Sequence, residues 1–213
     1  MNRLRGAWRH YWVALRAMIL LTVVLGIGYT FVVTGIGQVA LPAQANGSMI
    51  ASDGRATASK STAIGSGLIG QAFTDAKGRP LPQWFQSRPS AATTNGPAGY
   101  DAAASSGSNL ATGNPVQVQA VKDRTAAIAK LDRVPESAVP SDAVTASASG
   151  LDPHISPDYA LLQVKRVADA RGLPEATVKK LVESKIQGRG LGYLGDPTVN
   201  VLQLNLALAQ LGR

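Results

Sequence analysis

The longest uniformly apolar segment lies near the start of the chain. Residues 17–39 contain no Asp, Glu, Lys, Arg or His, and a helix of ~20 such residues is long enough to cross the hydrocarbon core of a bilayer. Four glycines occur in this segment, but no two of them have the Gly-x-x-x-Gly spacing. The pattern therefore predicts a transmembrane helix over residues 17–39, preceded by a short N-terminal segment of residues 1–16.

The charges on either side of this segment predict its orientation. Four arginines precede it, whereas the next basic residue after it is Arg55. Because short loops rich in Lys and Arg stay in the cytoplasm, we expect residues 1–16 to be cytoplasmic and the chain after about residue 40 to be extracytoplasmic. The alternative is a cleaved signal peptide, since Ala43-Gln44-Ala45 fits the small-x-small cleavage pattern. The apolar region of a signal peptide is typically ~7–15 residues long, so a retained anchor is favoured.

Small and polar residues dominate the segment after the span. Residues 46–62 are rich in Ser, Ala and Gly, which suits a tether or an edge element more than a core. Residues 68–73 form the first short strand candidate. Residues 91–114 are too poor in large side chains for a core and long for an idle loop. Such loops are usually disordered or shaped by a partner.

Helix start and stop signals recur in the second half of the chain. Three predicted helices each open at a capping residue or a proline and close at a glycine or before a proline. Their boundary signals are Asn114-Pro115 with an end before Pro135, Ser156-Pro157 with an end at Arg171 and Gly172, and Pro174 with an end near Gly188.

The last predicted helix has the clearest cap. Asn200 with Gln203 three residues later makes a capping box. The expected buried stripe of this helix comprises Val201, Leu204, Leu208 and Leu211. Taken together, the patterns predict a mixed α/β fold class: one N-terminal transmembrane helix, a tether over residues 40–62, and a single extracytoplasmic α/β domain over residues 63–213 with a helical C-terminal half.

Composition excludes several classes of function. The chain has 213 residues and no cysteine, which excludes disulfides, a thiolate nucleophile and any Cys-containing zinc site. Its two histidines, His10 and His154, lie in different regions, so a His-rich metal cluster is missing. The net charge of +8 comes partly from the N-terminal arginines, and no dense basic run occurs elsewhere. Nucleic acid is therefore not an expected partner.

Two glycine-rich matches to nucleotide-binding motifs lack the context those motifs need. Residues 65–70 satisfy Gly-x-Gly-x-x-Gly, but the residues after them do not look helical. Residues 54–61 fall one residue short of a P-loop, and no apolar strand precedes them. The Asp-Lys-Thr-Gly phosphorylation motif of P-type ATPases is absent. His154 is the only histidine outside the anchor region, and we interpret it as a satisfied loop residue rather than a hydrolase base.

One run of the chain is unusual in composition, Ser149-Gly150-Leu151-Asp152-Pro153-His154-Ile155-Ser156, and it lies within a longer segment from Val144 to Arg166. Further distinctive segments, in order along the chain, are residues 67–71, 84–91, 100–101, 106–110 and 192–202. Together with the anchor, this ordered set resembles the KdpC family, the C subunit of the bacterial Kdp potassium-transporting P-type ATPase. The resemblance covers essentially the whole chain.

The resemblance implies an accessory, non-catalytic subunit of the bacterial inner (plasma) membrane that assembles with KdpA, KdpB and KdpF. It would have no cofactor of its own, potassium would be the transported ion, and ATP would be hydrolysed by the B subunit. The roles proposed for the family are complex assembly, a catalytic chaperone that raises the ATP affinity of the B subunit, and shaping of the outer potassium entrance. The chaperone role conflicts with the predicted topology, because ATP is cytoplasmic.

The resemblance and the placement of residues give two groups of candidate site residues and no catalytic or metal site. Gln163 corresponds to a glutamine for which a ribose contact has been suggested in the family. It shares a helix face with Arg166, and we expect both to be exposed. The remaining candidates for nucleotide or partner contact are Ser106, Gly107, Ser108 and Asn109. The candidate acids of a cation entrance are Asp101, Asp152 and Asp158.

Two functions of other classes stay open at this point. One is a membrane-anchored periplasmic hydrolase, which lacks a convincing nucleophile and base. The other is a ligand-binding module in which the loop at residues 106–109 and Gln163 contact ATP or another phosphate compound.

Overall fold

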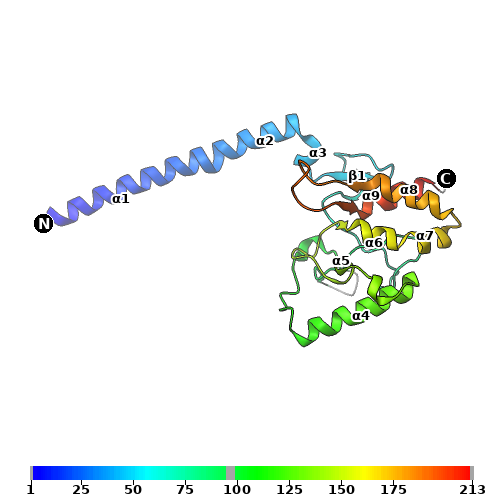
Figure 1. Ribbon diagram of the computed structural model, residues 1–213. Coiled ribbons are helices and arrows are strands. Elements are labelled where there is room, and N and C mark those ends of the chain that lie inside the picture. Colours follow the sequence, from blue (N-terminus) through cyan, green and yellow to red (C-terminus); the bar gives the residue numbers. More distant parts are fainter. Residues whose placement is uncertain (1, 95–98, 212–213) are drawn as a thin grey trace. The chain divides into compact units, whose positions relative to one another are not determined.

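The computed structural model describes residues 2–94 and 99–211. The chain divides into two units, Met1–Ser48 and Met49–Arg213, each with its own internal contacts. Figure 1 shows the first unit in blue as a long helix and the second as helices packed around short strands.

The first unit is the predicted membrane anchor. Helix α1 (Asn2–Leu21) continues through a π-helical segment, η1 (Thr22–Gly28), into α2 (Tyr29–Ala40). Its apolar part, Trp8–Ala40, is long and apolar enough to cross a membrane. The single predicted span is therefore confirmed by length and composition, and the helix begins well before residue 17. Leu41 interrupts the helix, and Pro42 starts the short α3 (Pro42–Ala45).

The segment predicted as a tether contains part of the folded domain. Strand β1 (Met49–Ala51) pairs antiparallel with β2 (Ala63–Ser66), and Ile50 is buried. The second unit consequently begins at Met49 rather than at residue 63. The strand predicted over residues 68–73 is wrong, since these residues form turns and irregular structure, with Leu68 exposed. The strand forms instead at Ala63–Ser66, where β1 provides its pairing partner.

A small antiparallel sheet organises the second half of the domain. Its order is β3 (His154–Ile155), β5 (Thr198–Asn200) and β4 (Ile186–Gln187), so the last strand in the sequence lies in the centre. Helices α6 (Pro157–Leu162), α7 (Val164–Arg171), α8 (Glu175–Lys185) and α9 (Val201–Leu211) pack around it. The remaining helical elements are η2 (Ala102–Ala104), α4 (Pro115–Asp132), η3 (Glu136–Ala138) and α5 (Ser141–Val144). The predicted mixed α/β class is confirmed.

The capping signals place most helix starts correctly. The Asn114 side chain accepts from the Val116 N–H at 2.9 Å, and Ser156 Oγ accepts from the Tyr159 N–H at 3.1 Å. Asn200 Oδ1 likewise accepts from the Gln203 N–H at 3.1 Å. Each bond satisfies one N–H that the helix itself leaves unpaired. These three predicted starts are confirmed.

Two helix predictions are wrong in detail. The helix expected from Pro157 to Arg171 is interrupted at Gln163, where α6 ends and α7 begins, although its predicted stop at Gly172 is confirmed by a φ of 65°. In α9 the expected buried residue Leu211 is 42% exposed, whereas Asn205 is buried. The end of α9 extends past the core, so its last stripe position has nothing to pack against.

The hydrophobic core joins residues from distant parts of the chain. Phe85 is fully buried although it lies in an irregular segment, and it belongs to the same cluster as Val178 and Val182 of α8 and Leu204 and Leu208 of α9. Full burial of such a side chain contributes about 1.5–3 kcal/mol. The segment around Phe85 is therefore anchored in the domain.

Candidate functional site

Gln163 and Arg166, predicted to be exposed contact residues, are buried. Gln163 has no exposed surface and Arg166 is 8% exposed. Both lie on the side of α6 and α7 that faces the irregular segment at residues 82–86. The prediction of an accessible face is wrong because the break at Gln163 and the contacts of this segment cover what would be the polar face of a free helix.

Arg166 uses its guanidinium group to join three parts of the domain. Its Nε donates to Asp132 Oδ1 of α4 at 2.6 Å, and its Nη1 donates to the Pro82 carbonyl at 2.6 Å and the Trp84 carbonyl at 3.0 Å. Its Nη2 donates to Gln163 Oε1 at 2.7 Å. A buried charge is tolerated only when it is paired and hydrogen-bonded in this manner. Arg166 is thus a structural connector between α4, α7 and residues 82–84.

Two buried amides hold the next two residues of the same segment. Gln163 Oε1 accepts from the Gln86 N–H at 2.7 Å, and its Nε2 donates to the Gln86 carbonyl at 3.2 Å. Likewise, Asn205 Oδ1 of α9 accepts from the Phe85 N–H at 2.9 Å, and its Nδ2 donates to the Phe85 carbonyl at 2.9 Å. A side-chain amide matches a backbone N–H and C=O as a neighbouring strand would. We call Gln163, Arg166 and Asn205 the clamp, because together they satisfy the backbone of a segment that belongs to no sheet.

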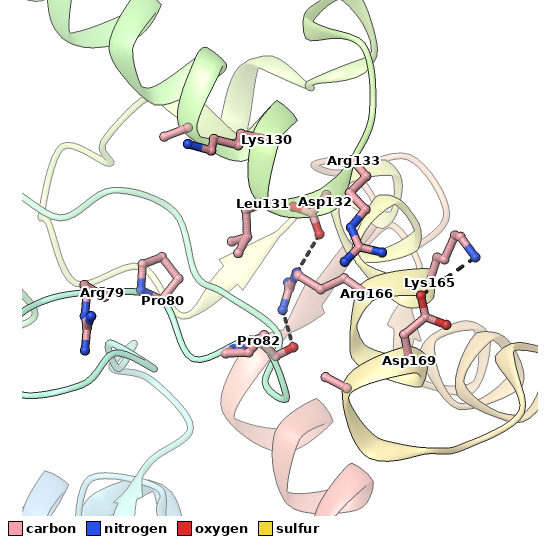
Figure 2. Close-up of a pocket in the computed structure, with 12 residues that line it drawn as sticks. Arg79, Pro80, Pro82, Lys130, Leu131, Asp132, Arg133, Lys165, Arg166 and Asp169 are labelled. Atoms are coloured by element: carbon pink, nitrogen blue, oxygen red, sulfur yellow. Dashed lines mark hydrogen bonds and ion pairs between the residues drawn. The ribbon is translucent and has the colours of Figure 1, made fainter.

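An open groove lies beside the clamp. Its volume is about 870 Å³, and α4, α7 and the turn before Pro82 contribute its walls. Figure 2 shows Asp132 and Arg166 joined across it. Four exposed cations line its edge, and within the described residues two of them have an acid at ion-pair distance: Arg79 with Asp75 at 2.7 Å and Lys165 with Asp169 at 3.8 Å. The exposed basic residues are Arg79, Lys130, Arg133 and Lys165.

Asp132 is the buried acid of this groove. Burial raises the pKa of the Asp132 carboxyl, and the Arg166 guanidinium partly opposes that rise. Its Oδ1 is bound to Arg166, whereas Oδ2 accepts no hydrogen bond from the residues that the structure describes. The pair is therefore sensitive to the loss of either partner, because the remaining charge would stay buried.

The long loop between residues 91 and 114 packs, where it is described, against the loop that precedes β3. Ser90 Oγ donates to the Gly150 carbonyl at 2.6 Å, and the Ser106 N–H donates to the Ser149 carbonyl at 3.0 Å. Gly150 has a φ of 68°, and a Cβ there would lie 2.5 Å from the Ser106 carbonyl oxygen and 2.7 Å from the Ala92 nitrogen. Only glycine fits this position. The family-like run at residues 149–156 is in this respect a packing motif.

The three candidate entrance acids have different surroundings. Asp152 Oδ2 accepts from Arg88 Nη1 at 2.9 Å and Oδ1 accepts from the His154 N–H at 3.0 Å. Asp101 caps η2 through the Ala103 N–H at 2.9 Å and accepts a hydrogen bond from Thr94. Asp158 is exposed in the first turn of α6. Asp152 is therefore a partner in a loop ion pair, while Asp158 is the most accessible of the three.

The carboxyl groups of two of these acids keep their charge at neutral pH. Burial alone would raise the pKa of Asp152, but the hydrogen bonds from His154 and the nearby Arg88 outweigh it, and the net shift is downward. The hydrogen bond from Thr94 lowers the pKa of Asp101. Burial raises the pKa of the neighbouring Tyr100 to about 12, so its hydroxyl stays protonated and donates to the Arg88 carbonyl at 2.7 Å.

The loop at residues 106–109 remains accessible at most of its positions. Ser106, Ser108 and Asn109 are exposed, whereas Gly107 is half-buried. A Cβ at Gly107 would lie 2.9 Å from the Ala148 carbonyl oxygen. The structure does not bring this loop together with the clamp, whose side chains are already occupied. The six residues predicted as one contact set therefore do not form one site.

The structure also bears on the hydrolase and metal alternatives. His154 is half-buried, and its Nδ1 lies 3.3 Å from Asp152 Oδ1, within the same loop ion-pair cluster as Arg88. That arrangement fits the interpretation of His154 as a satisfied loop residue. Among the residues described, no group of three or more His, Asp or Glu side chains could hold a metal ion.

Sequence reasoning missed Asp132 and Asn205. Asn205 lies between two leucines in α9, one position from Leu204 of the predicted buried stripe, and a polar residue at such a position is a signal for a buried hydrogen bond. Asp132 lies 34 positions from its partner Arg166. No local pattern connects two residues at that separation.

Comparison with known proteins agrees with the segments quoted from the sequence. The family described as "KdpC: K+-transporting ATPase, c chain" matches residues 11–210. A "Potassium-transporting ATPase KdpC subunit" of Caldanaerobacter subterraneus subsp. tengcongensis is 49% identical over 189 residues, 88% of each chain. The protein of the same name from Dechloromonas aromatica is 47% identical over 195 residues, 92% of this chain and 94% of that one. With a match that spans both the anchor and the domain, this chain belongs to the KdpC family.

Proposed function

We propose that this chain supports assembly of a potassium-transporting P-type ATPase and potassium uptake by it, as a single-pass subunit that assembles with KdpA, KdpB and KdpF. Membership of the family already makes it an accessory subunit with a role in potassium transport. The observation that carries the finer proposal is the match over residues 11–210, which includes the anchor and the whole described domain.

The domain is proposed to act on the extracytoplasmic side of the inner membrane. The arginines before the span and their absence from its immediate C-terminal flank support this orientation. In that compartment the exposed Asp158 and the charged, partly exposed Asp101 are the acids best placed to attract cations. Asp152 contributes less, because Arg88 offsets its charge.

The burial of Gln163 and Arg166 weighs against a nucleotide contact through these side chains. Every polar atom of Gln163 is occupied by Gln86 or Arg166, so a ribose would have to displace an internal bond. A catalytic-chaperone role would therefore need another surface of the chain.

A second candidate function, a ligand-binding module, is favoured by the basic groove. Four exposed cations line a groove of about 870 Å³, and such a cluster suits a phosphate compound. The double variant Lys130→Gln/Arg133→Gln tests it in the purified complex. A higher ATP concentration at half-maximal activity in this variant would support ligand binding in the groove. The control is Lys179→Gln, which removes an exposed cation of α8 outside the groove and should leave that concentration unchanged.

The main proposal is tested with three preparations of the pump: with the full chain, without it, and with the chain truncated after Ser48. We expect loss of the assembled, potassium-stimulated ATPase without the chain. If the truncated form assembles but requires more potassium for activity, the domain acts on potassium entry. If it requires more ATP, the result supports a role of the domain in nucleotide binding. An unchanged pump in all three preparations would contradict the proposal.

A further inference from the structure

The loop between β4 and β5 presents large apolar side chains to solvent. Leu191, Tyr193 and Leu194 are 82%, 69% and 54% exposed. They belong to a tight hairpin closed by two backbone bonds between Gly190 and Leu194, at 2.9 Å and 2.8 Å. Folded domains rarely place several adjacent large apolar side chains at a loop tip unless the tip contacts another surface.

The backbone of the hairpin is strained at one of these exposed residues, Leu191. Leu191 has a φ of 52°, the left-handed conformation that costs a residue with a side chain about 1–2 kcal/mol. Glycines occur on both sides of it, at Gly190 and Gly192, yet the strained position itself carries a leucine. Strain maintained at an exposed position points to a contact that the leucine makes outside the domain.

Hydrogen bonds link the start of the domain to β5, the strand that follows the hairpin. Met49, the first residue of the domain, pairs with Ser66. The adjacent Gly67 carbonyl accepts from Asn200 Nδ2 at 2.8 Å, and Asn200 ends the strand that the hairpin precedes. The exposed Leu68 follows directly in the same turn. The start of the domain is thus joined to the far end of β5, and this short strand separates that contact from the hairpin.

The short connection to the span limits how far Met49, the start of the domain, can be from the bilayer. Residues 41–48 are all that separate Ala40, the end of the apolar helix, from Met49. Even fully extended, this link reaches at most about 30 Å. Since only β5, about 10 Å long, separates the hairpin from the contact with Gly67, the hairpin can reach the membrane interface.

We propose that the hairpin at residues 188–196 is a second membrane contact, which inserts Leu191, Tyr193 and Leu194 into the interfacial region of the lipid bilayer. Tyrosine and leucine suit that region, where an apolar body is buried and a hydroxyl stays hydrated. Arg189 and Asp196 at the base pair at 3.3 Å, so the tip brings no net charge with it. A lipid surface fits better than a protein partner, because a stable protein interface takes ~20–30 residues a side and this tip offers three large side chains.

The absence of native cysteine makes a direct test practicable. The full-length chain, carrying Leu191→Cys and an environment-sensitive fluorophore, is reconstituted in phosphatidylethanolamine–phosphatidylglycerol vesicles, alone and within the purified complex. Ser108→Cys, in an exposed polar loop, is the matched control. We expect a blue-shifted emission at position 191 and a several-fold larger quenching by nitroxide-labelled lipids than at position 108, in both preparations.

Two outcomes would overturn the proposal. If the probe at position 191 is quenched by aqueous iodide as strongly as the control and not by nitroxide lipids, the hairpin is solvated. If its emission shifts only in the complex, without lipid quenching, the hairpin contacts another subunit. Tyr193→Cys repeats the measurement at a second exposed position, so that a local effect of one substitution does not decide the result. Neither outcome depends on whether the chain supports potassium transport.

Discussion

The clamp and the apolar hairpin reverse the usual placement of polar and apolar residues. Gln163, Arg166 and Asn205 are buried, whereas Leu191, Tyr193 and Leu194 are among the most exposed large side chains of the domain. The buried polar groups satisfy the backbone of an irregular segment that enters the core. The exposed apolar groups have no such internal task. Buried polar residues therefore help the apolar core to hold this domain together, while its exposed apolar tip is available for contact with something outside.

The largest expected effect breaks the clamp. Arg166→Ala removes the guanidinium that binds Asp132, Gln163 and two carbonyls. We expect the free energy of unfolding to fall by about 3–5 kcal/mol, because an unpaired buried carboxylate remains. Urea unfolding of the full chain in detergent measures it by tryptophan fluorescence, with Trp8→Phe and Trp12→Phe in every chain compared so that Trp84 alone reports. Lys165→Ala, the exposed neighbour, should change stability by no more than about 0.5 kcal/mol; equal losses in the two variants would contradict the assigned role of Arg166.

The next largest expected loss of unfolding free energy concerns the tight packing of the loop at residues 145–156. Gly150→Ala should cost about 2–4 kcal/mol, since it adds left-handed strain and overlap with the Ser106 carbonyl oxygen. Gly172→Ala is the matched control: its φ of 65° is similar, but no atom lies within 4 Å of the added Cβ. Its expected cost is only about 1 kcal/mol. The comparison uses thermal unfolding followed by circular dichroism, and indistinguishable losses would show that overlap has no part in the effect.

A smaller effect concerns the loop ion pair and has a defined pH dependence. The pKa of Asp152 is lower in the folded chain than its ordinary value of 3.8. Its contribution to stability is therefore fully present above that value and is lost as the pH falls through the folded pKa. Asp152→Asn should be less stable than the unaltered chain at pH 7, and the difference should shrink below about pH 4. A difference that stays constant down to pH 2, measured by urea unfolding, would assign the loss to packing instead of charge.

The smallest expected change in the free energy of unfolding concerns the apolar hairpin. Leu191→Ser replaces an exposed leucine and should change the free energy of unfolding by no more than about 0.5 kcal/mol. Leu204→Ala, in the core of α9, should cost about 2–5 kcal/mol under the same conditions. A large loss for Leu191→Ser in urea unfolding would mean that the hairpin supports the fold, and the comparison with the clamp would no longer hold.

Local signals in the sequence were sufficient for the helix starts and for the span. The caps at Asn114, Ser156 and Asn200 and the stop at Gly172 act on their own helix ends, within a few residues. The apolar run of the anchor likewise needs no neighbour in order to be recognised. The family could also be identified from the sequence, because its characteristic segments occur in the same order along this chain.

The span, the caps and the family could thus be predicted from local patterns and their order, whereas the burial of particular polar residues could not. Helical periodicity placed Gln163 and Arg166 together on one face, but it could not show that residues 82–86 cover that face. Burial depends on contacts between positions about 80 to 120 residues apart, as in the bonds of Arg166 with Pro82 and of Asn205 with Phe85. Such contacts form only when the whole domain closes around its core, because backbone groups drawn out of water must find partners wherever the fold brings them.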